Sequence, residues 1–418
     1  MVNNHNELIV SLDIGTSKVR IMIGEIDGGT MNIIGVGQAR SEGIKRGAIV
    51  DIDQTVHAIR EAVDHAERMV DVSVDEVFVG VSGNHIELVD TQGVVAVSSD
   101  DREIKDEDIE RVIQAAKVVA IPPDREIIEV VPKEFIVDGL GGIKDPRGMI
   151  GVRLEMEGMI VTGSKTVLHN IVRCVERANL RIGGIFLQPL AASEVALSKD
   201  DKNMGVALVD IGAGSTTVAV FEHGHMVAIS VIGIGGDHIT NDIALGLRTH
   251  TDVAEKVKVK HGCALIDEAS EEETFKVSRI GSQVEKQFTQ VDLANIIEPR
   301  AAEIFQLIDE EIHRLGFAEI AGGYVLTGGT VSMPGMVELA KEELNAPVRV
   351  AIPDYIGVRD PAYMTGVGLI QYAAARAGKR REVAVQGAKS GFKPAASNRQ
   401  KESGTLLERV KNWFSEFI

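Results

Sequence analysis

Apolar runs of strand length occur twice along the chain in the same arrangement. The first copy covers residues 8–23 and the second covers 205–220. Each copy consists of an apolar run, the triplet Asp-Ile-Gly, a turn of small and hydroxyl residues, and a second apolar run. A third strand-like run follows each copy, at residues 31–36 and 226–232. This repeat predicts two β-meanders built on the same plan, and therefore two similar domains.

Segments with helical spacing lie between these runs. Apolar residues recur every three or four positions within residues 54–70, and either Asp51 or Asp53 can cap the helix that this spacing predicts. Residues 166–178 show a second amphipathic helical pattern, whereas 77–81 has the composition of a short buried strand. Because strands and helices alternate in both halves, the pattern predicts α/β sheets.

Two segments interrupt this alternation. Residues 86–164 contain strand and helix patterns of their own before the chain returns to the first half. Residues 246–317 are largely helical by pattern, and a clear helix is predicted over 299–315. We therefore expect two inserted subdomains.

The end of the chain has a different pattern. Residues 379–401 carry seven Lys and Arg residues against one acid, Glu382, a composition that predicts a flexible basic linker over 379–404. After Thr405, which can cap a helix, apolar residues recur at spacings that place them on one helical face. They are Leu406, Leu407, Val410, Trp413, Phe414, Phe417 and Ile418.

An amphipathic terminal helix behind a basic linker has three interpretations. A helix docked on the protein core rarely needs a structureless connection of this length. Aromatic and aliphatic residues on one face of a helix that follows a basic segment are typical of a helix that lies in the interface of an anionic membrane. Docking into a groove of another protein is the remaining alternative. The pattern favours the membrane.

Composition narrows the class of protein. The chain has 418 residues, of which 44% are hydrophobic and 25% charged, as is usual for a few globular domains. A net charge of −18 argues against nucleic acid as a partner. The two cysteines, Cys174 and Cys263, fit a reducing compartment. We expect neither a signal peptide nor a membrane-spanning segment.

The two Asp-Ile-Gly turns carry the residue types of a phosphate site. Glycine lets the backbone approach a ligand closely, so that N–H groups of the turn can bind phosphate oxygens. Asp13 and Asp210 would repel phosphate directly and would instead hold Mg²⁺ or its water ligands. One such turn is also typical of an ordinary hairpin, but two on facing domains would enclose a polyphosphate.

A third glycine-rich turn follows an apolar strand at residues 323–327. Gly328 and Gly329 permit the close approach of a flat ring, which suits the base and ribose of a nucleotide. The alternative is a plain turn between a strand and a helix. Neither the Walker pattern nor the Rossmann glycine fingerprint is present.

These three turns resemble the two phosphate motifs and the adenosine motif of the actin/Hsp70/sugar-kinase ATPase superfamily. Within it, the chain resembles the FtsA family of actin-like bacterial cell-division proteins over almost its whole length. Further matching strings are Ile-Ile-Gly-Val-Gly at 33–37, Val-Lys-His-Gly-Cys-Ala at 259–264 and Ile-Glu-Pro-Arg at 297–300. The position of the insertion at 86–164 and the terminal helix also match.

The resemblance implies an α/β fold of duplicated actin-like (RNase H-like) ATPase domains with two inserted subdomains, a flexible linker and a C-terminal amphipathic helix. The implied bounds are 1–85 for subdomain 1A, 86–164 for 1C, 165–200 for the return to 1A, 201–245 for 2A, 246–317 for 2B, 318–378 for 2A and a return to 1A, 379–404 for the linker and 405–418 for the helix. Residues 185–197 and 363–369 resemble the two connecting helices, whose small residues would allow close packing.

The resemblance also implies roles for individual residues. Asp13 and Asp210 would serve the Mg²⁺ shell, and Arg300 with Glu303 would hold the C-terminal peptide of the tubulin-like division protein FtsZ. The nucleotide-binding residues would be Gly15, Thr16, Ser17, Lys18, Gly212, Gly214, Ser215, Thr216, Glu255, Lys258, Gly328, Gly329 and Thr330.

Gln188 stands where actin has a water-positioning glutamine. FtsA-like proteins keep this group poorly, so the resemblance implies ATP binding with weak or no hydrolysis. The other interpretation of Gln188 is a polar residue at the end of a strand.

As a whole, the resemblance implies an ATP-binding protein that polymerises head to tail. It would lie on the cytoplasmic face of the cell membrane at the division septum, contact anionic lipid, tether the FtsZ ring and recruit downstream division proteins. The alternatives are another actin-like scaffold, of the pilus assembly type, and a sugar kinase or polyphosphate hydrolase of the same fold. A terminal amphipathic helix favours the first interpretation over both.

Overall fold

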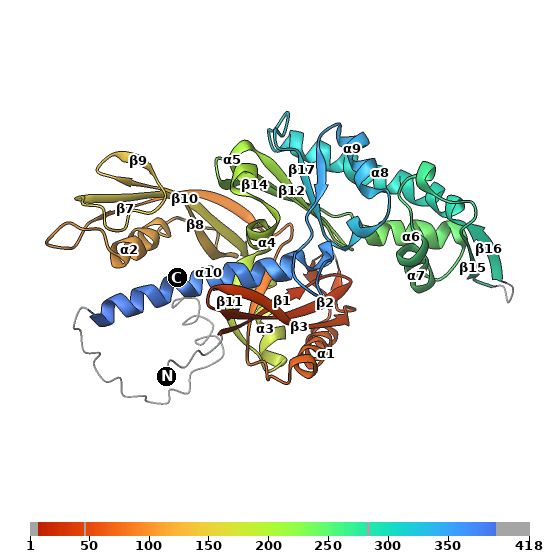
Figure 1. The fold of residues 1–418 in the computed structure, drawn as a ribbon, viewed down its shortest axis with the longest axis horizontal. Coiled ribbons are helices and arrows are strands. Elements are labelled where there is room, and N and C mark those ends of the chain that lie inside the picture. The colour runs from red at the N-terminus through yellow and green to blue at the C-terminus, as the bar shows by residue number, and fades with distance from the viewer. Residues whose placement is uncertain (1–6, 46, 282–284, 390–418) are drawn as a thin grey trace. The chain divides into compact units, whose positions relative to one another are not determined.

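The computed structural model describes residues 7–45, 47–281 and 285–389. The chain divides into two compact units (Figure 1). One unit consists of Met1–Ile86 and Thr166–Gln371, and the other consists of Glu87–Lys165 and the chain from Tyr372 onward. The terminal residues 405–418, which include the predicted membrane helix, lie outside the described part of the chain.

The first unit contains two sheets built on one plan. The first sheet has the strand order β11-β6-β1-β2-β3, and the second has the order β14-β13-β12-β17-β18. In each, three strands form an antiparallel meander and two further strands add in parallel on the side of the first meander strand. This confirms the duplicated α/β architecture that the two Asp-Ile-Gly repeats predicted.

The bounds of these strands lie close to the apolar runs of the sequence. They are β1 (Glu7–Ile14), β2 (Lys18–Asp27), β3 (Thr30–Arg40), β6 (Glu76–Val81), β11 (Arg181–Leu187), β12 (Val206–Ile211), β13 (Thr216–Glu222), β14 (His225–Ile232), β17 (Tyr324–Thr327) and β18 (Val348–Val350). Two short strands, β4 (Ile44–Lys45) and β5 (Ala48–Ile49), pair with each other.

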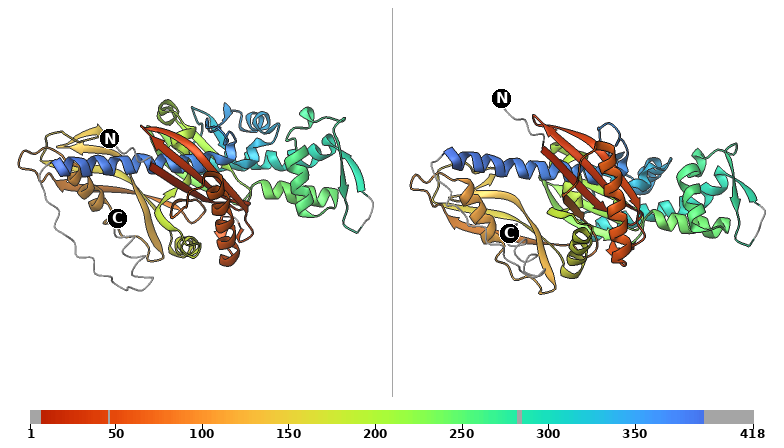
Figure 2. Two further views of the ribbon diagram at one scale, coloured as in Figure 1. Left: turned by 60° about the horizontal axis from the view of Figure 1, so that its bottom comes forward. Right: turned by 90° about the horizontal axis from the view of Figure 1, so that it is seen from below.

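Helices cover the sheets with their apolar faces. Helix α1 (Ile52–Val70) packs against β2 and β3 (Figure 2), and Asp51 is its cap because one carboxylate oxygen accepts a hydrogen bond from the Gln54 N–H at 3.0 Å. The other helices of this unit are α3 (Lys165–Arg177), α4 (Gln188–Ala196), α5 (Lys199–Met204), α6 (Gly236–Leu247), α7 (Thr251–His261), α8 (Gln290–Arg314) and α9 (Met336–Leu344). Short 3₁₀ turns cover Ile266–Glu268, Gly329–Ser332 and Pro361–Tyr363.

The predicted insertion at 246–317 differs from expectation in two ways. It contains a hairpin, β15 (Thr274–Ser278) and β16 (Glu285–Thr289), and its long helix α8 begins at Gln290 and not at 299. Pro299 is typical of a first helical turn, but here it lies inside the helix. Buried residues of α8 and of the hairpin share one hydrophobic core with the second sheet.

The connecting helices differ from their predicted bounds. The first, α4, begins at Gln188 because residues 185–187 are the end of β11. The second, α10 (Met364–Lys389), extends far beyond residue 369. Consequently the linker predicted from residue 379 is wrong over its first eleven residues, which are helical. Residues 379–389 contain no proline and include two Lys, two Arg and two Ala residues, which favour helices.

The second unit contains a four-stranded sheet with the order β7-β10-β8-β9. Its elements are β7 (Glu87–Ala96), α2 (Asp106–Ala116), β8 (Arg125–Val137), β9 (Leu140–Ile143) and β10 (Arg153–Ser164). Helix α2 packs against β7 and β10 around a core that includes Val112 and Leu154. Within this unit, α10 is anchored by Tyr372 and Arg376, which bind the buried carboxylate of Glu129 at 2.9 and 2.7 Å.

Candidate functional site

The two glycine turns have the same local geometry. In the first, the Gly15 N–H donates to the carbonyl of Lys18 at 3.1 Å, and in the second the Gly212 N–H donates to the carbonyl of Ser215 at 3.0 Å. A Cβ atom at position 15 would lie 2.8 Å from the Lys18 carbonyl oxygen, so the tight turn requires glycine there. The sequence repeat is therefore a repeat of one backbone turn that is closed by the same hydrogen bond.

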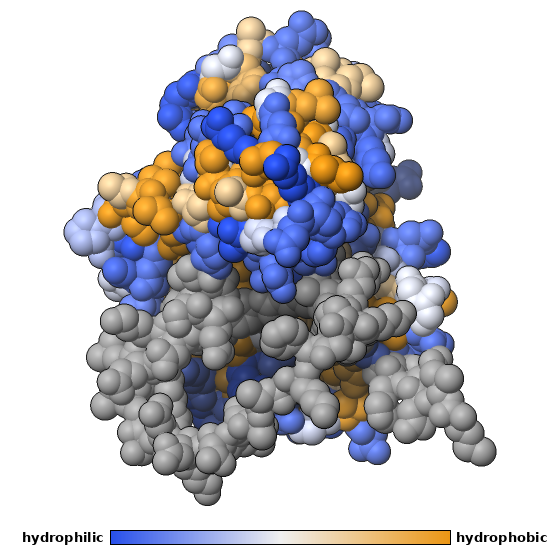
Figure 3. Space-filling model, turned by 90° about the vertical axis from the view of Figure 1, so that its left-hand side faces the viewer, coloured by the Kyte–Doolittle hydropathy of each residue, from blue (hydrophilic) through white to orange (hydrophobic). Residues whose placement is uncertain are grey.

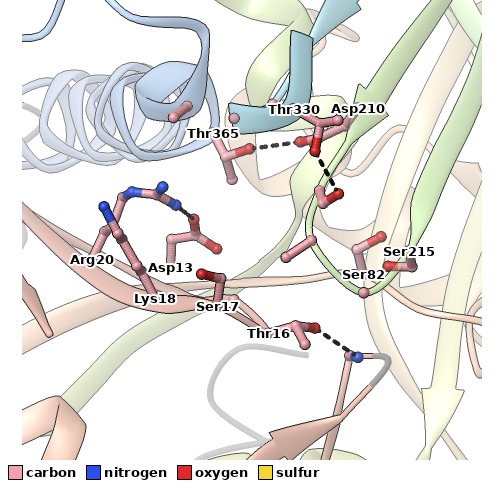
Figure 4. Close-up of a pocket in the computed structure, with 18 of the residues that line it drawn as sticks. Asp13, Thr16, Ser17, Lys18, Arg20, Ser82, Asp210, Ser215, Thr330 and Thr365 are labelled. Carbon is pink, nitrogen blue, oxygen red and sulfur yellow. Dashed lines mark hydrogen bonds and ion pairs between the residues drawn. The ribbon is translucent and has the colours of Figure 1, made fainter. Parts of the chain in front are cut away.

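The turns from the two halves of the unit meet at one cavity. Thr16 of the first turn lies against Gly214 of the second, where a Cβ atom would be 2.7 Å from the Thr16 hydroxyl. That hydroxyl also accepts a hydrogen bond from the Gly47 N–H at 3.3 Å (Figure 4). Only glycine at 214 permits this approach of the two turns.

The cavity has a volume of about 390 Å³. It is lined by Asp13, Asp210, Gln188 and all but one of the predicted nucleotide-binding residues. These lining residues are Gly15, Thr16, Ser17, Lys18, Gly212, Gly214, Ser215, Glu255, Lys258, Gly328, Gly329 and Thr330. Segments more than 300 residues apart in sequence thus contribute to one site.

Thr216 is the exception, and its predicted role is wrong. Its side chain is fully buried, and its hydroxyl donates to the carbonyl of Ile234 at 2.8 Å. Successive residues of a strand face opposite sides of the sheet. Thr217, the next residue of β13, is the one that lines the cavity.

The two aspartates lie on the wall of this cavity with few cationic partners. The amide of Gln188 donates to Asp13 at 2.9 Å, and Arg20 is 3.8 Å from the other oxygen of Asp13. The hydroxyl of Thr365 donates to Asp210 at 3.3 Å. Burial raises the pKa of Asp13, although Arg20 opposes this, and burial together with the charge of Asp13 raises the pKa of Asp210 to about 6.

This pair of carboxylates suits a divalent cation with oxygen ligands. In the described part of the chain, no group of three or more His, Cys, Asp or Glu residues could hold a metal ion. A cation at Asp13 and Asp210 would therefore take its remaining ligands from water or a bound phosphate, as Mg²⁺ commonly does. The donor set fits Mg²⁺ bound together with a nucleotide.

The third glycine turn combines two different functions. Gly328 has a φ of 95°, and a Cβ atom there would lie 2.5 Å from both Asp210 and the carbonyl oxygen of Ile211. Gly328 therefore makes room for the protein's own turn, and not only for a ring. A Cβ atom at Gly329 would meet only Ala362, at 3.6 Å, so this position is open toward the cavity. Thr330 ties the turn to Gly212 through a 2.9 Å hydrogen bond.

Helix α7 supplies the remaining wall. The ammonium group of Lys258 is buried and donates to the carbonyl of Gly236 at 3.0 Å and to the hydroxyl of Thr240 at 2.7 Å. It also lies 2.6 Å from the carboxylate of Glu255. Lys258 thus fastens α7 to α6, and the partly exposed Glu255 remains beside the cavity.

Other lining residues were not predicted from the sequence, and four of them have polar side chains that contact the aspartates or join the two halves of the unit. Arg20 and Thr365 contact the two aspartates, and the hydroxyl groups of Ser82 and Thr217 lie 3.1 Å apart across the two halves. Alternation along β2 offered a signal for Arg20, because Lys18 and Arg20 must share one face. Ser82 and Thr365 carry no local motif and are brought here only by the topology.

The predicted partner-binding pair lies elsewhere, on α8. The guanidinium of Arg300 donates to Asp242 of α6 at 2.6 Å and also forms an ion pair with Glu303. Both side chains are partly exposed, with 29% and 45% of their surface accessible. Arg300 therefore joins two helices in addition to facing solvent.

The duplicated sheets and the cavity between their glycine turns define an actin-like ATPase fold. Solved structures share it at low identity. A PilM–PilN type IV pilus biogenesis complex matches with a TM-score of 0.61 at 15% identity, covering 87% of this chain and 98% of that chain. MreB5 of Spiroplasma citri bound to ADP matches with a TM-score of 0.53 at 12% identity, covering 91% and 98%. A MamK double helical filament matches with a TM-score of 0.51 at 13% identity, covering 88% and 99%.

Family models and relatives specify the protein further. The model "Cell division protein FtsA" matches residues 207–368, and "SHS2 domain inserted in FTSA" matches 83–162. Cell division protein FtsA of Bacillus subtilis is 56% identical over 390 residues, which are 93% of this chain and 87% of the relative. The Pseudomonas aeruginosa protein of that name is 40% identical over 414 residues, 97% of each chain. The chain belongs to the FtsA family and is an actin-like cell-division protein.

Proposed function

We propose that this cell-division protein binds Mg-ATP in the cavity between its two glycine turns. The observation that carries the proposal is the convergence of two matched turns, the buried Asp13 and the partly buried Asp210 on one cavity of about 390 Å³. That volume lies within the range of about 300–1,000 Å³ usual for small-molecule sites. The turn amides that do not already donate within the turns would bind phosphate, Asp13 and Asp210 would hold the cation, and Gly329 would leave space for the ring or ribose.

Equilibrium titration tests this proposal. The full chain should bind one ATP per molecule, and Mg²⁺ should raise the affinity. A second titration with Gly329→Val should show weaker binding whether or not Mg²⁺ is present, because the substitution adds bulk at a residue that lines the cavity. The absence of ATP binding to the folded wild-type chain would refute the proposal.

Hydrolysis of the bound ATP is proposed to be weak or absent. Gln188 is the candidate for positioning water, but its amide nitrogen is engaged by Asp13 at 2.9 Å and lies 3.5 Å from the carbonyl oxygen of Gly80. A catalytic amide would have to leave these contacts. This arrangement supports a nucleotide-dependent scaffold over a sugar kinase or a polyphosphate hydrolase.

Polymerisation head to tail is the second part of the proposal. Several exposed apolar side chains belong to the unit that contains the inserted sheet. Figure 3 shows the side of the molecule on which β7 and β9 lie in Figure 1. These side chains are Val94, Val118, Leu140, Ile150 and Val152. A contact between different surfaces of successive molecules does not close on itself and so propagates. The MamK filament has the same fold.

Membrane attachment is proposed to occur through residues 405–418, on the evidence of their amphipathic pattern alone. Within the described ranges, every helix is too short or too polar to cross a bilayer. A peripheral helix on anionic lipid would place the polymer on the cytoplasmic face of the membrane at the septum.

The partner proposal concerns the FtsZ C-terminal peptide and the partly exposed pair Arg300 and Glu303. An acidic peptide group would have to compete with Asp242 for the Arg300 guanidinium, since these two residues are in contact at 2.6 Å. Binding of this peptide together with membrane attachment would tether the FtsZ ring and allow later division proteins to be recruited.

A further inference from the structure

Arg20 lies within the candidate site, although no motif marks it. On β2 it stands directly opposite Asp13 of β1, and therefore both side chains are on the same face of the sheet. Lys18, two residues earlier on the same strand, shares that face. All three residues line the cavity, and Figure 4 shows the Arg20 side chain directed toward Asp13.

The guanidinium of Arg20 is incompletely paired by the protein. Its nearest carboxylate oxygen, on Asp13, is 3.8 Å from Nη1, which is longer than a hydrogen bond. Its Nε atom is buried and has no hydrogen-bond acceptor among the residues that the structure describes. The ring of Tyr363 lies below the guanidinium, 5.8 Å from Cζ. Arg300, by contrast, places its Nε 2.6 Å from a carboxylate.

A buried donor without an acceptor raises the free energy of the folded protein. This geometry therefore suits a ligand that brings an acceptor to Arg20. The planar fork of donors matches the oxygens of a phosphate group better than a single-point cation does. Arg20 and Asp13 face each other across the pair of β1 and β2, so a ligand group at Asp13 also lies near Arg20. Asp13 and Asp210 would hold the cation that accompanies the last two phosphates of a nucleoside triphosphate, and the terminal phosphate would then lie within reach of Arg20.

We propose that Arg20 binds the terminal phosphate of the nucleotide and makes the site prefer a nucleoside triphosphate to a diphosphate. The inference rests on the proposed function of the cavity as an ATP site. Arg20 would then donate to the terminal phosphate when ATP is bound, and without ATP its only ion-pair contact among the described residues is with Asp13, at 3.8 Å. Lys18 on the same strand face supplies charge but not the bidentate geometry.

Dissociation constants for ATP and ADP, measured by titration calorimetry on the full chain with Mg²⁺, test this inference. In Arg20→Gln, the dissociation constant for ATP should rise by about tenfold or more, and that for ADP by less than about twofold. Arg20→Lys should show an intermediate loss for ATP. Arg181→Gln is the matched control, because Arg181 belongs to the same sheet but is exposed and paired with Glu76.

The two proposals fail in different ways in this experiment. If the wild-type chain binds neither nucleotide, the ATP site itself is refuted. The inference is overturned if the wild-type chain binds ATP and Arg20→Gln weakens the binding of ATP and of ADP equally, or weakens the binding of neither. Arg20 would then be only a counter-ion of Asp13. Thermal unfolding checks that each variant folds. If Arg20→Gln does not fold, the same comparison of ATP and ADP affinities in Arg20→Lys tests the inference.

Discussion

Gly368 of α10 lies against Ala191 of α4 so closely that a Cβ atom at position 368 would be 2.4 Å from the Ala191 carbonyl oxygen. Gly366 is similarly confined, because a Cβ atom there would be 2.3 Å from the sulfur of Met22. The same helix carries Thr365, which binds Asp210. Close packing of the two connecting helices thus positions a cavity residue.

Gly368→Val should destabilise the protein by roughly 1–3 kcal/mol, because a backbone carbonyl cannot yield easily to an added side chain. Urea unfolding of the full chain measures the change. Gly233→Ala is the matched control, since nothing lies within 4 Å of a Cβ atom at that position, and it should change stability by less than about 0.5 kcal/mol. Equal stability of wild type and Gly368→Val would contradict the packing described here.

Asp210→Ala should weaken ATP binding mainly when Mg²⁺ is present, because it removes one of two carboxylates available to the cation. Titrations with Mg²⁺ and with a chelator separate the two contributions. Asp242→Ala, which removes a carboxylate on α6 that binds Arg300, serves as a control for general electrostatic effects. Unchanged Mg²⁺-dependent affinity in Asp210→Ala would reject the metal role.

The raised pKa of Asp210 predicts a pH dependence with a definite sign. Because the folded-state pKa of about 6 lies above the ordinary value of 3.8, folding favours the protonated form, and the metal-free protein loses stability as pH rises between about 4 and 6. Mg²⁺ needs the ionised form, so Mg²⁺-dependent ATP affinity should fall as pH drops through about 6. Asp210→Asn should flatten both profiles. Thermal unfolding and titration from about pH 4 to about pH 8 check this expectation.

Trp413→Glu places a charge in the middle of the apolar face of the terminal segment and should release the protein from anionic vesicles while ATP binding persists. Co-sedimentation with vesicles measures the release, and the fluorescence of Trp413, the single tryptophan, reports on this segment in the wild-type chain. Asn412→Glu introduces the same charge on the polar face and is the control. Complete sedimentation of the Trp413→Glu protein would exclude the membrane role.

Reversing the charge of Arg300 should abolish binding of the FtsZ peptide, but the contact with Asp242 means that Arg300→Glu also removes a link between α8 and α6. Glu303→Gln leaves that link intact and is the cleaner variant. Peptide binding measured by fluorescence anisotropy should weaken in both variants, with a lowered thermal midpoint in Arg300→Glu only. Full peptide binding by both folded variants would remove this helix as the site.

The sequence predicted the duplicated sheets and the cavity residues because the determinants are local. Asp13 and Asp210 each end an apolar strand before a glycine turn, and that arrangement dictates where the backbone turns. The error at Thr216 arose because a shift of one residue in a strand exchanges its faces. Pro299 inside α8 shows tertiary context overriding a local boundary signal. The extension of α10 to Lys389 has a local cause instead, because the basic residues that predicted a linker also favour a helix.

Other features of the site depend on contacts between distant segments. Ser82 meets Thr217 across 135 positions, and Thr365 meets Asp210 across 155. No periodicity or motif in a single chain encodes such pairs. Arg20 could be predicted in part. Strand alternation places it on the same face as Lys18, but its position opposite Asp13 depends on the register of the hairpin.

Hydrogen exchange of the full chain with and without Mg-ATP tests the central claim most directly. The account predicts that amides of the first turn, near Gly15, and of the second turn, near Gly212, gain protection together on addition of Mg-ATP. Because these turns are almost 200 residues apart in sequence, joint protection requires one ligand between them. Protection of only one turn, or of neither at saturating nucleotide, would contradict a nucleotide site shared by the two halves.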